Sequence, residues 1–167
     1  MIRRKPVSAA RYRAFLEVLR SADGLWDVSR RFLAPYGLSP SQFNVLHLLS
    51  DQPNGYSQIE VSRLLITHRS NVTGLVDRLV RRGWVARRDS NKDRRAYRIV
   101  LTTRGRATLN RVLPSYYRAA DGIWKGAAIG SPGRLANALS KLCQNAERTV
   151  NGIHAHTGGK QKRRLRG

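Results

Sequence analysis

The sequence predicts a mainly α-helical protein with one small β-hairpin. Apolar side chains recur at spacings of three and four through most of the 167 residues, which is the period of an amphipathic helix. Residues 84–102 differ, because two runs rich in β-branched and apolar residues flank a short polar tip. Hydrophobic residues make up 41% of the chain, which is enough to bury a core and excludes a disordered polyelectrolyte.

Two helices are expected at the start of the chain. Residues 8–35 carry apolar side chains at helical spacings and predict one long helix. The next helix begins after Ser39, which can act as N-cap, while Pro40 suits the first helical position and Gln42 can complete a capping box. The turn-forming run QPNG ends this second helix.

Two shorter helices follow, separated by a tight link. The run YSQIEVSRLLI, residues 56–66, contains Ser57 as an N-cap three residues before Glu60, which is a capping box. The run THRSNVTGLVDRLVRRG ends at Gly83, a residue suited to the left-handed backbone that terminates helices. The pair is a helix-turn-helix pattern, whose second helix can enter the major groove of DNA.

The second helix of this pair has two different faces. Its apolar residues fall on one side, and the opposite side presents small polar groups near its start and arginines further along. Short polar side chains can approach base edges closely, whereas arginines suit phosphates. A solvated surface helix is the simpler alternative. The residues expected to contact DNA are His68, Arg69, Ser70, Asn71, Thr73, Arg78 and Arg81.

The tip of the predicted hairpin carries Lys92, Asp93, Arg94 and Arg95 in succession. Turns are usually polar, so solvation alone could explain these charges. However, a charged hairpin directly after a helix-turn-helix makes a winged helix, in which a wing arginine can sense the negative potential of the minor groove. Asp93 is expected to orient Arg95, since a carboxylate can accept the hydrogen bonds of a guanidinium.

Two further helices and a basic tail are expected at the end of the chain. The fifth helix follows Thr102 and should be kinked or broken near Pro114. The sixth begins at Ser131 as its N-cap and carries an apolar stripe. Residues 154–167 include two adjacent glycines, and the last eight residues carry five cations, so a disordered tail is expected here.

The charge of the chain indicates a polyanionic partner. Lys and Arg number 32 against 10 acidic residues, which gives a formal net charge of +22 and a pI near 11.7. Nucleic acid is the commonest partner of so basic a domain, and an anionic membrane surface is the weaker alternative. The basic tail is expected to add nonspecific DNA binding to any specific contact.

Several function classes are not expected. Cys143 is the single cysteine, which excludes a disulfide framework, fits a reducing cytoplasm and suggests a buried structural thiol. His154 and His156 have no nearby cysteine or acid cluster, so no metal site is expected, and no cofactor. The sequence has no catalytic triad order, paired carboxylates or phosphate loop, so the protein is not expected to be an enzyme. No membrane span or secretory signal is expected.

The run LSPSQFNVLHLL, followed by VTGLVDRLVRRGWVARRDSNKDRRAYRIVLTTRG, resembles the MarR family of bacterial transcription regulators. The family's Asp-x-Arg wing motif matches Asp93 and Arg95, and its LTxxG motif matches Leu101, Thr102 and Gly105. The specific likeness covers about residues 36–110. The sequence departs from the family at ITHRS, where a glycine and a serine cap are usual, which leaves the start of the fourth helix open.

The resemblance implies a homodimer that binds double-stranded DNA. Residues 8–35 and 103–153 would form the helical dimerisation region, and residues 36–102 the winged helix-turn-helix, with two copies straddling a pseudo-palindromic operator as a repressor. A nucleoid-type protein without sequence preference is the alternative. The resemblance also implies a cleft for a small aromatic or phenolic ligand, although core packing is an alternative role for each lining residue. The candidate cleft residues are Trp26, Tyr36, His47, Tyr116, Tyr117 and Trp124.

Overall fold

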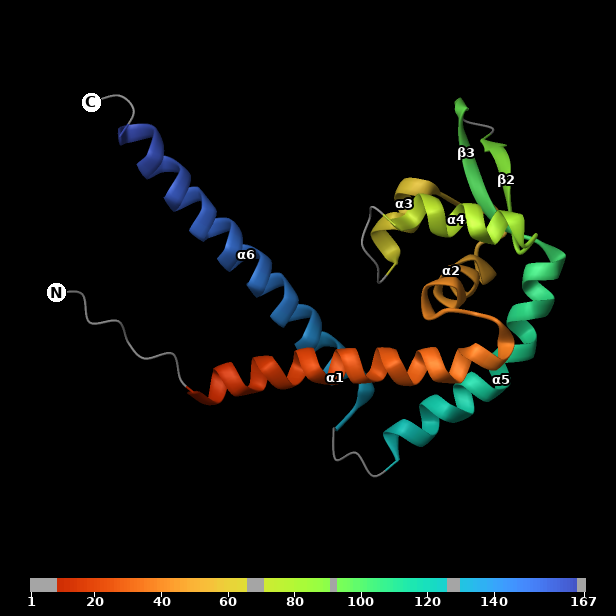
Figure 1. Ribbon diagram of the computed structural model, residues 1–167, viewed down its shortest axis with the longest axis horizontal. Helices are drawn as coiled ribbons and strands as arrows, with labels where there is room; N and C mark the ends of the chain where they lie inside the picture. The colour runs from red at the N-terminus through yellow and green to blue at the C-terminus, as the bar shows by residue number, and fades with distance from the viewer. Residues whose placement is uncertain (1–8, 66–70, 91–92, 126–129, 165–167) are drawn as a thin grey trace. The chain divides into compact units, whose positions relative to one another are not determined.

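The computed structural model describes residues 9–65, 71–90, 93–125 and 130–164, with side chains over 9–65, 71–89, 97–125 and 130–152. The chain divides into two compact units, residues 1–116 and 117–167. The second contains the end of α5 and all of α6 (Pro132–Arg164). The first contains, in chain order, α1 (Ala9–Leu33), the 3-10 turn η1 (Ala34–Tyr36), α2 (Pro40–Ser50), β1 (Tyr56–Ser57), α3 (Gln58–Leu64), α4 (Val72–Arg81), β2 (Val85–Ser90), β3 (Asp93–Leu101) and most of α5 (Thr103–Trp124) (Figure 1).

The predicted capping boxes set the starts of α2 and α3. The Ser39 hydroxyl accepts from the backbone N–H of Gln42 at 3.3 Å, and the Gln42 side chain accepts from the N–H of Ser39 at 2.9 Å. Ser57 and Glu60 make the same reciprocal pair at the start of α3. Each box satisfies two backbone donors that a helix start otherwise leaves open. The predicted starts of both helices are therefore confirmed.

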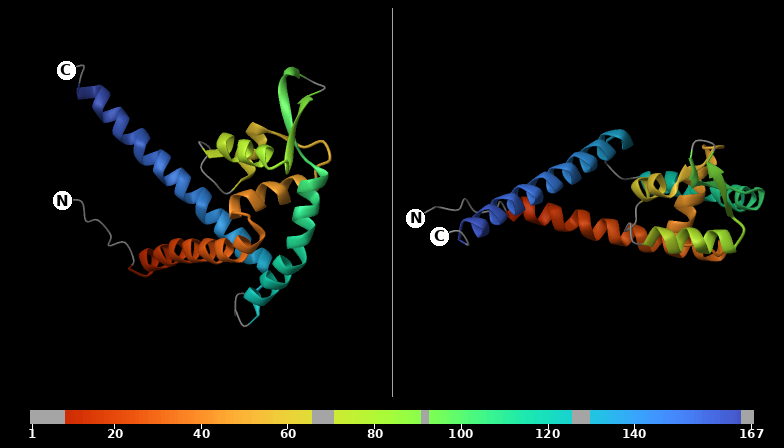
Figure 2. Two further views of the ribbon diagram at one scale, coloured as in Figure 1. Left: turned by 45° about the vertical axis from the view of Figure 1, so that its right-hand side comes forward. Right: turned by 90° about the horizontal axis from the view of Figure 1, so that it is seen from above.

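Three antiparallel strands form a small sheet in the order β1-β3-β2. The expected hairpin is confirmed as β2 and β3, with Val85 paired to Leu101 and Asp89 paired to Tyr97, and it projects from the neighbouring helices (Figure 2). The sequence missed β1, whose two residues are too few to show a period. β3 already begins at Asp93, so the paired part of the hairpin reaches further into the predicted tip than expected.

Thr102 and Gly105, part of the LTxxG motif, connect β3 to α5. The Thr102 hydroxyl donates to the carbonyl of Gly83 at 2.7 Å and accepts from the N–H of Gly105 at 3.0 Å. A Cβ on Gly105 would lie 2.0 Å from the backbone oxygen of Trp84, so only glycine permits this approach. The motif therefore fixes the end of the hairpin against the first turn of α5.

The hydrophobic core lies in the first unit, among α2, α3, α4, the sheet and the adjoining ends of α1 and α5. The apolar stripe predicted for α4 is confirmed, because Val72, Leu75, Val76 and Leu79 are all buried. Burying such a side chain contributes about 1.5–3 kcal/mol relative to leaving it in water. The core therefore holds α4 by one face and leaves its opposite face in solvent.

The expected break of α5 at Pro114 is absent, and a kink there stays a prediction. Pro114 lies on the exposed side of α5, where water can satisfy the carbonyl that loses its N–H partner. Two expectations for α6 are wrong. α6 continues to Arg164, so residues 154–164 are helical rather than disordered, as the many Lys, Gln and Arg residues among them favour. Cys143 is exposed rather than buried, because α6 adds no residue to the core.

The apolar residues of α6 remain open to solvent in the single chain. Leu139, Leu142 and Val150 are exposed, and within residues 132–152 only Leu135 is even partly covered. Among the helices that the structure describes, none combines the length and apolar character needed to cross a membrane. The exposed stripe of α6 is thus an amphipathic face without a partner in its own unit.

Candidate nucleic-acid interface

The outer face of α4 presents several of the residues expected to read DNA. Asn71 is the N-cap residue of α4, and its side chain makes no capping hydrogen bond and is exposed. Thr73, Arg78 and Arg81 are also exposed. The remaining candidates, His68, Arg69 and Ser70, lie outside the described residues. The face that the core leaves open is therefore polar and cationic, as an element entering the major groove requires.

Neighbouring arginines in this region have different roles. Arg82 follows the exposed Arg81 directly, yet its Nη1 donates to the carbonyl of Gly37 at 2.6 Å and its guanidinium lies 4.8 Å from the Trp84 ring centroid. Arg98 is likewise held, donating to the carbonyl of Gly55 at 2.6 Å. These arginines fasten loops to the core, which composition alone did not reveal.

Gln58 and Tyr97 link α4 to the wing through hydrogen bonds. The Tyr97 hydroxyl donates to Gln58 Oε1 at 2.8 Å, and Gln58 Nε2 donates to Thr73 Oγ1 at 2.7 Å. Arg87 makes a second link, because it donates to Asp77 at 2.5 Å and lies 5.0 Å from the Tyr97 ring centroid. We call Gln58, Thr73, Asp77, Arg87 and Tyr97 the α4–wing circuit.

The acids near α3 and α4 are engaged inside the protein. The backbone N–H of Ser57 donates to Glu60 and holds the pKa of that carboxyl below its usual value. Asp77 accepts from Arg87 and raises the pKa of that guanidinium. Both carboxylates are paired with arginines, Asp77 with Arg87 and Glu60 with Arg98, so they offset these cations locally. The exposed arginines of α3, α4 and β2 that face solvent around them are Arg63, Arg78, Arg81 and Arg88.

The wing carries the second group of predicted contacts. Its strands β2 and β3 are described, but the side chains of Lys92, Asp93, Arg94 and Arg95 lie outside the described residues. The expected pairing of Asp93 with Arg95 therefore stays a prediction. The backbone does place Asp93, Arg94 and Arg95 at the far end of the hairpin, since Ser90 pairs with Asp93.

Three of the six candidate cleft residues gather in one aromatic cluster. Tyr116 lies 4.4 Å from Phe43 and 5.9 Å from Phe32 between ring centroids. Tyr36 and His47 join through the same two phenylalanines, at 6.0 Å from Phe32 and 5.8 Å from Phe43. The sequence did not single out either phenylalanine as a cleft residue, although each lies on an apolar helix face.

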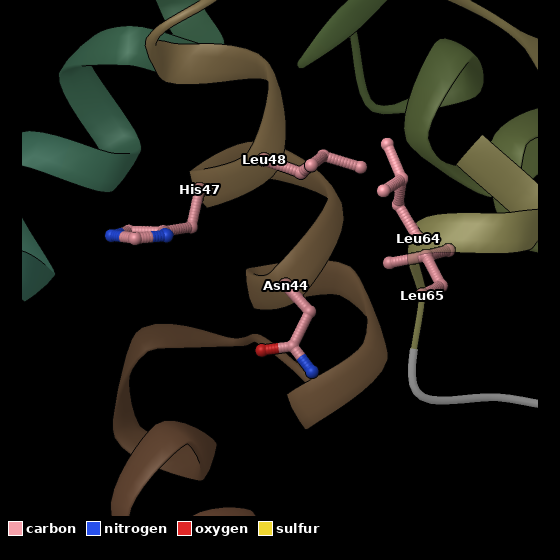
Figure 3. Close-up of a pocket in the computed structure, with 5 residues that line it drawn as sticks. All are labelled: Asn44, His47, Leu48, Leu64 and Leu65. Carbon is pink, nitrogen blue, oxygen red and sulfur yellow. The ribbon is translucent and has the colours of Figure 1, made fainter. Parts of the chain in front are cut away.

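The other three candidate cleft residues lie elsewhere. Trp26 is half-buried further along α1, whereas Tyr117 and Trp124 are exposed and belong to the second unit. A shallow pocket of about 200 Å³ lies between α2 and the end of α3, lined by Asn44, His47, Leu48, Leu64 and Leu65. Leu48 points toward Leu64 across this pocket, while the His47 ring points to the other side of α2 (Figure 3). No group of three or more metal-ligating acids, histidines or cysteines gathers among the described residues.

Comparison with known proteins identifies the family. A MarR family model matches residues 36–96. The transcriptional repressor MprA of Escherichia coli K12 is 32% identical over 113 residues, which cover 67% of this chain but only 64% of MprA. The transcriptional activatory protein BadR of Rhodopseudomonas palustris is 30% identical over 148 residues, covering 87% of this chain and 85% of BadR.

A solved structure of a DNA complex is also similar. The M. tuberculosis transcriptional regulator MosR, crystallised in complex with DNA, is 27% identical and superposes with a TM-score of 0.67. The match covers 81% of this chain and 97% of MosR, so it includes helices outside the winged domain. With its capped helices, its wing and its LTxxG junction, the chain belongs to the MarR family of winged helix-turn-helix proteins.

Proposed function

We propose that this protein is a transcription regulator that binds double-stranded DNA sequence-specifically as a homodimer. The observation that carries the proposal is that α4 has one buried apolar face and one exposed polar face. Its apolar face is fully engaged in the core, while its other face exposes Asn71, Thr73, Arg78 and Arg81. A helix held so firmly by one side can place short polar groups against base edges with little loss of conformational freedom.

The proposed dimer would be built from the helices outside the winged domain. Tyr12, Phe15 and Leu19 of α1 are exposed, as are Leu139 and Leu142 of α6. Exposed apolar faces at helical spacing are typical of surfaces that a partner covers. A two-fold dimer would present two copies of α4 to two half-sites about 34 Å apart, one turn of DNA.

Repression is the direction that we favour. The similar proteins include a repressor, MprA, and an activatory protein, BadR, so the family alone allows both directions. Repression needs only that a bound dimer cover promoter DNA, whereas activation also needs a contact with the transcription machinery. The proposed operator is therefore one that overlaps a promoter.

Control by a small aromatic or phenolic ligand is part of the same proposal. The cluster of Tyr36, His47 and Tyr116 around Phe43 supplies rings that such a ligand could stack on. It lies next to α2, which packs against α4 in the core, so a ligand there could shift the recognition helix. Core packing is the competing role for these rings.

Selection of bound sites from random duplexes tests the proposal. A dimeric regulator should enrich a pseudo-palindrome whose half-sites are about one helical turn apart. A nucleoid-type protein, which the net charge of +22 would suit, should enrich no sequence. Absence of any enriched site would contradict the proposed function and favour nonspecific binding.

A further inference from the structure

The α4–wing circuit joins the two elements that are expected to touch DNA. We propose that Gln58 and Tyr97 are positioning residues for DNA recognition, which hold the Thr73 hydroxyl and the base of the wing in one geometry. The helix and the wing would then contact DNA as one rigid body. This inference rests on the proposed function and adds to it two residues that no sequence pattern singles out.

The hydrogen-bonded arm of the circuit uses Gln58 as a rigid spacer. Its Oε1 accepts from Tyr97 of β3 and its Nε2 donates to Thr73 of α4, so both polar atoms of the amide are engaged. The backbone at Gln58 is itself fixed, because it follows the N-cap Ser57, which also pairs with Arg98 in the sheet. Thr73 is β-branched and has few helical rotamers, so this bond selects the direction of its hydroxyl.

The charged arm of the circuit makes a second connection to α4. Arg87 of β2 donates to Asp77 and lies over the Tyr97 ring. Thr73 and Asp77 are four residues apart, so they lie one turn apart on the same side of α4. The wing is thus attached to the recognition helix at two successive turns. Two attachment points restrain rotation as well as distance, which one contact cannot do.

The exposure of the circuit indicates a geometric rather than a stabilising role. The Arg87 and Asp77 side chains are 33% and 45% exposed, and Tyr97 is 37% exposed. Polar pairs this open to water contribute little to folding, since solvent competes for the same groups. The buried residues on the opposite face of α4 already hold the helix in place. What the circuit adds is a fixed angle between α4 and the hairpin.

The wing tip magnifies any error in that angle. Tyr97 lies four residues from Asp93, where β3 begins, and a strand rises about 3.3 Å per residue. The tip is therefore about 13 Å beyond the attachment, and a tilt of about 10° there would move it by about 2 Å. Recognition sites need their groups placed within about 0.5 Å, so such a tilt would remove wing contacts.

A double-mutant cycle with Tyr97→Phe and Thr73→Val tests the inference. Tyr97→Phe removes only the hydroxyl and keeps the ring beside Arg87, and Thr73→Val replaces the hydroxyl by a methyl of similar size. The two hydroxyls bond to Gln58 and not to each other, so any coupling between them must pass through its amide. Affinity would be titrated for a duplex selected by the wild-type protein and for a random duplex, beside the thermal unfolding midpoint.

Each single substitution should weaken operator binding about fivefold, and the double variant should be no weaker than about the same fivefold. Gln58→Ala should match the double variant, and adding Tyr97→Phe to it should change affinity less than about twofold. Binding to random duplex and the unfolding midpoint should stay close to wild type for all of them. Gln52→Ala, which truncates an exposed glutamine in the turn after α2, is the matched control for Gln58→Ala and should have no effect.

The alternatives give different results. Reductions in affinity that multiply in the double variant, or a Tyr97→Phe variant that binds like wild type, would overturn the inference and leave the proposed function standing. Equal reductions on operator and random duplex with a lower unfolding midpoint would also overturn it, because they indicate a merely structural role. A wild-type protein without preference for any duplex would refute the proposed function, and this inference with it.

Discussion

The winged domain and α6 differ in how far their apolar side chains are covered. Within the first unit, the apolar faces of α2 and α4 are buried against each other and the sheet, and Val45, Leu46 and Leu79 are fully covered. Leu139, Leu142 and Val150 of α6 have similar apolar character and helical spacing, yet they are exposed. The winged domain therefore completes its own core, whereas α6 leaves its apolar stripe exposed in the single chain.

The largest expected effect comes from disrupting the hydrophobic core of the winged domain. Leu79→Ala removes a side chain of α4 that is 0% exposed and leaves a cavity under this helix. The variant should lose about 2–5 kcal/mol of unfolding free energy, a large part of the stability of a small domain. Denaturant unfolding followed by circular dichroism measures it. A decrease below about 1 kcal/mol would mean that α4 is not held by this core.

The second prediction concerns the exposed apolar stripe of α6. Leu142→Ala on α6 should leave the unfolding of the winged domain nearly unchanged but raise the dimer dissociation constant about tenfold or more, because the interface is deprived of one apolar side chain from each copy. Sedimentation at several protein concentrations measures this constant, with Ser140→Ala on a neighbouring exposed position as control. A monomer at all concentrations in the wild type would show that α6 is not a dimerisation surface.

The third prediction distinguishes arginines of the winged domain that are expected to contact DNA from a neighbour that stabilises the fold. Arg78→Ala and Arg81→Ala should weaken binding to all duplexes and flatten the slope of log affinity against log salt by about one for each phosphate that is no longer neutralised. Arg82→Ala should instead lower stability by about 1 kcal/mol, because Arg82 holds the Gly37 carbonyl and the Trp84 ring. Similar salt slopes for all three variants would contradict this division of roles.

The fourth prediction concerns the cationic residues between positions 159 and 167. Deleting residues 159–167 removes five of the 32 Lys and Arg residues without touching the winged domain. Affinity for random duplex should fall and its salt dependence should become shallower, because fewer counterions are released. The ratio of operator to random affinity should change little. A collapse of that ratio would mean that the tail reads bases.

The smallest expected effect is a pH dependence at the start of α3. The pKa of Glu60 is lowered, mainly by the hydrogen bond from the backbone of Ser57. Its stabilising contribution is therefore present above the ordinary glutamate pKa of 4.5 and is lost as pH falls through the lowered pKa. Glu60→Gln should reduce stability slightly at neutral pH, and its difference from wild type should narrow in acid. Denaturant unfolding at neutral and at acidic pH measures the free energy of unfolding of both proteins. An equal difference between them at the two pH values would contradict this prediction.

Local patterns explain how much of the fold was predictable. The capping boxes at Ser39 and Ser57 join residues three apart, and the buried face of α4 follows from a helical period, so both were correctly predicted. β1 was missed because its pairing with β3 depends on residues far away, such as Tyr56 with Ile99. The predicted burial of Cys143 failed because a stripe on α6 does not by itself say whether its own chain covers it.

The candidate site was predictable only in part, for the same reason. The exposure of Asn71, Arg78 and Arg81 follows from the helical period of α4. The bond from Tyr97 to Gln58 joins residues 39 apart, and the one from Gln58 to Thr73 joins residues 15 apart. No spacing rule connects such positions, and only the packing of α3, α4 and the hairpin brings them together.

Titration of the wild-type protein with two duplexes measures whether it reads DNA sequence. The affinity for its selected operator and for a random duplex of equal length would be measured at several salt concentrations. We expect an operator preference of about 10³ or more that persists as salt is raised, since base contacts release few ions. Affinities that differ less than about tenfold, and that fall together with salt, would show that this protein binds phosphate backbones without reading sequence.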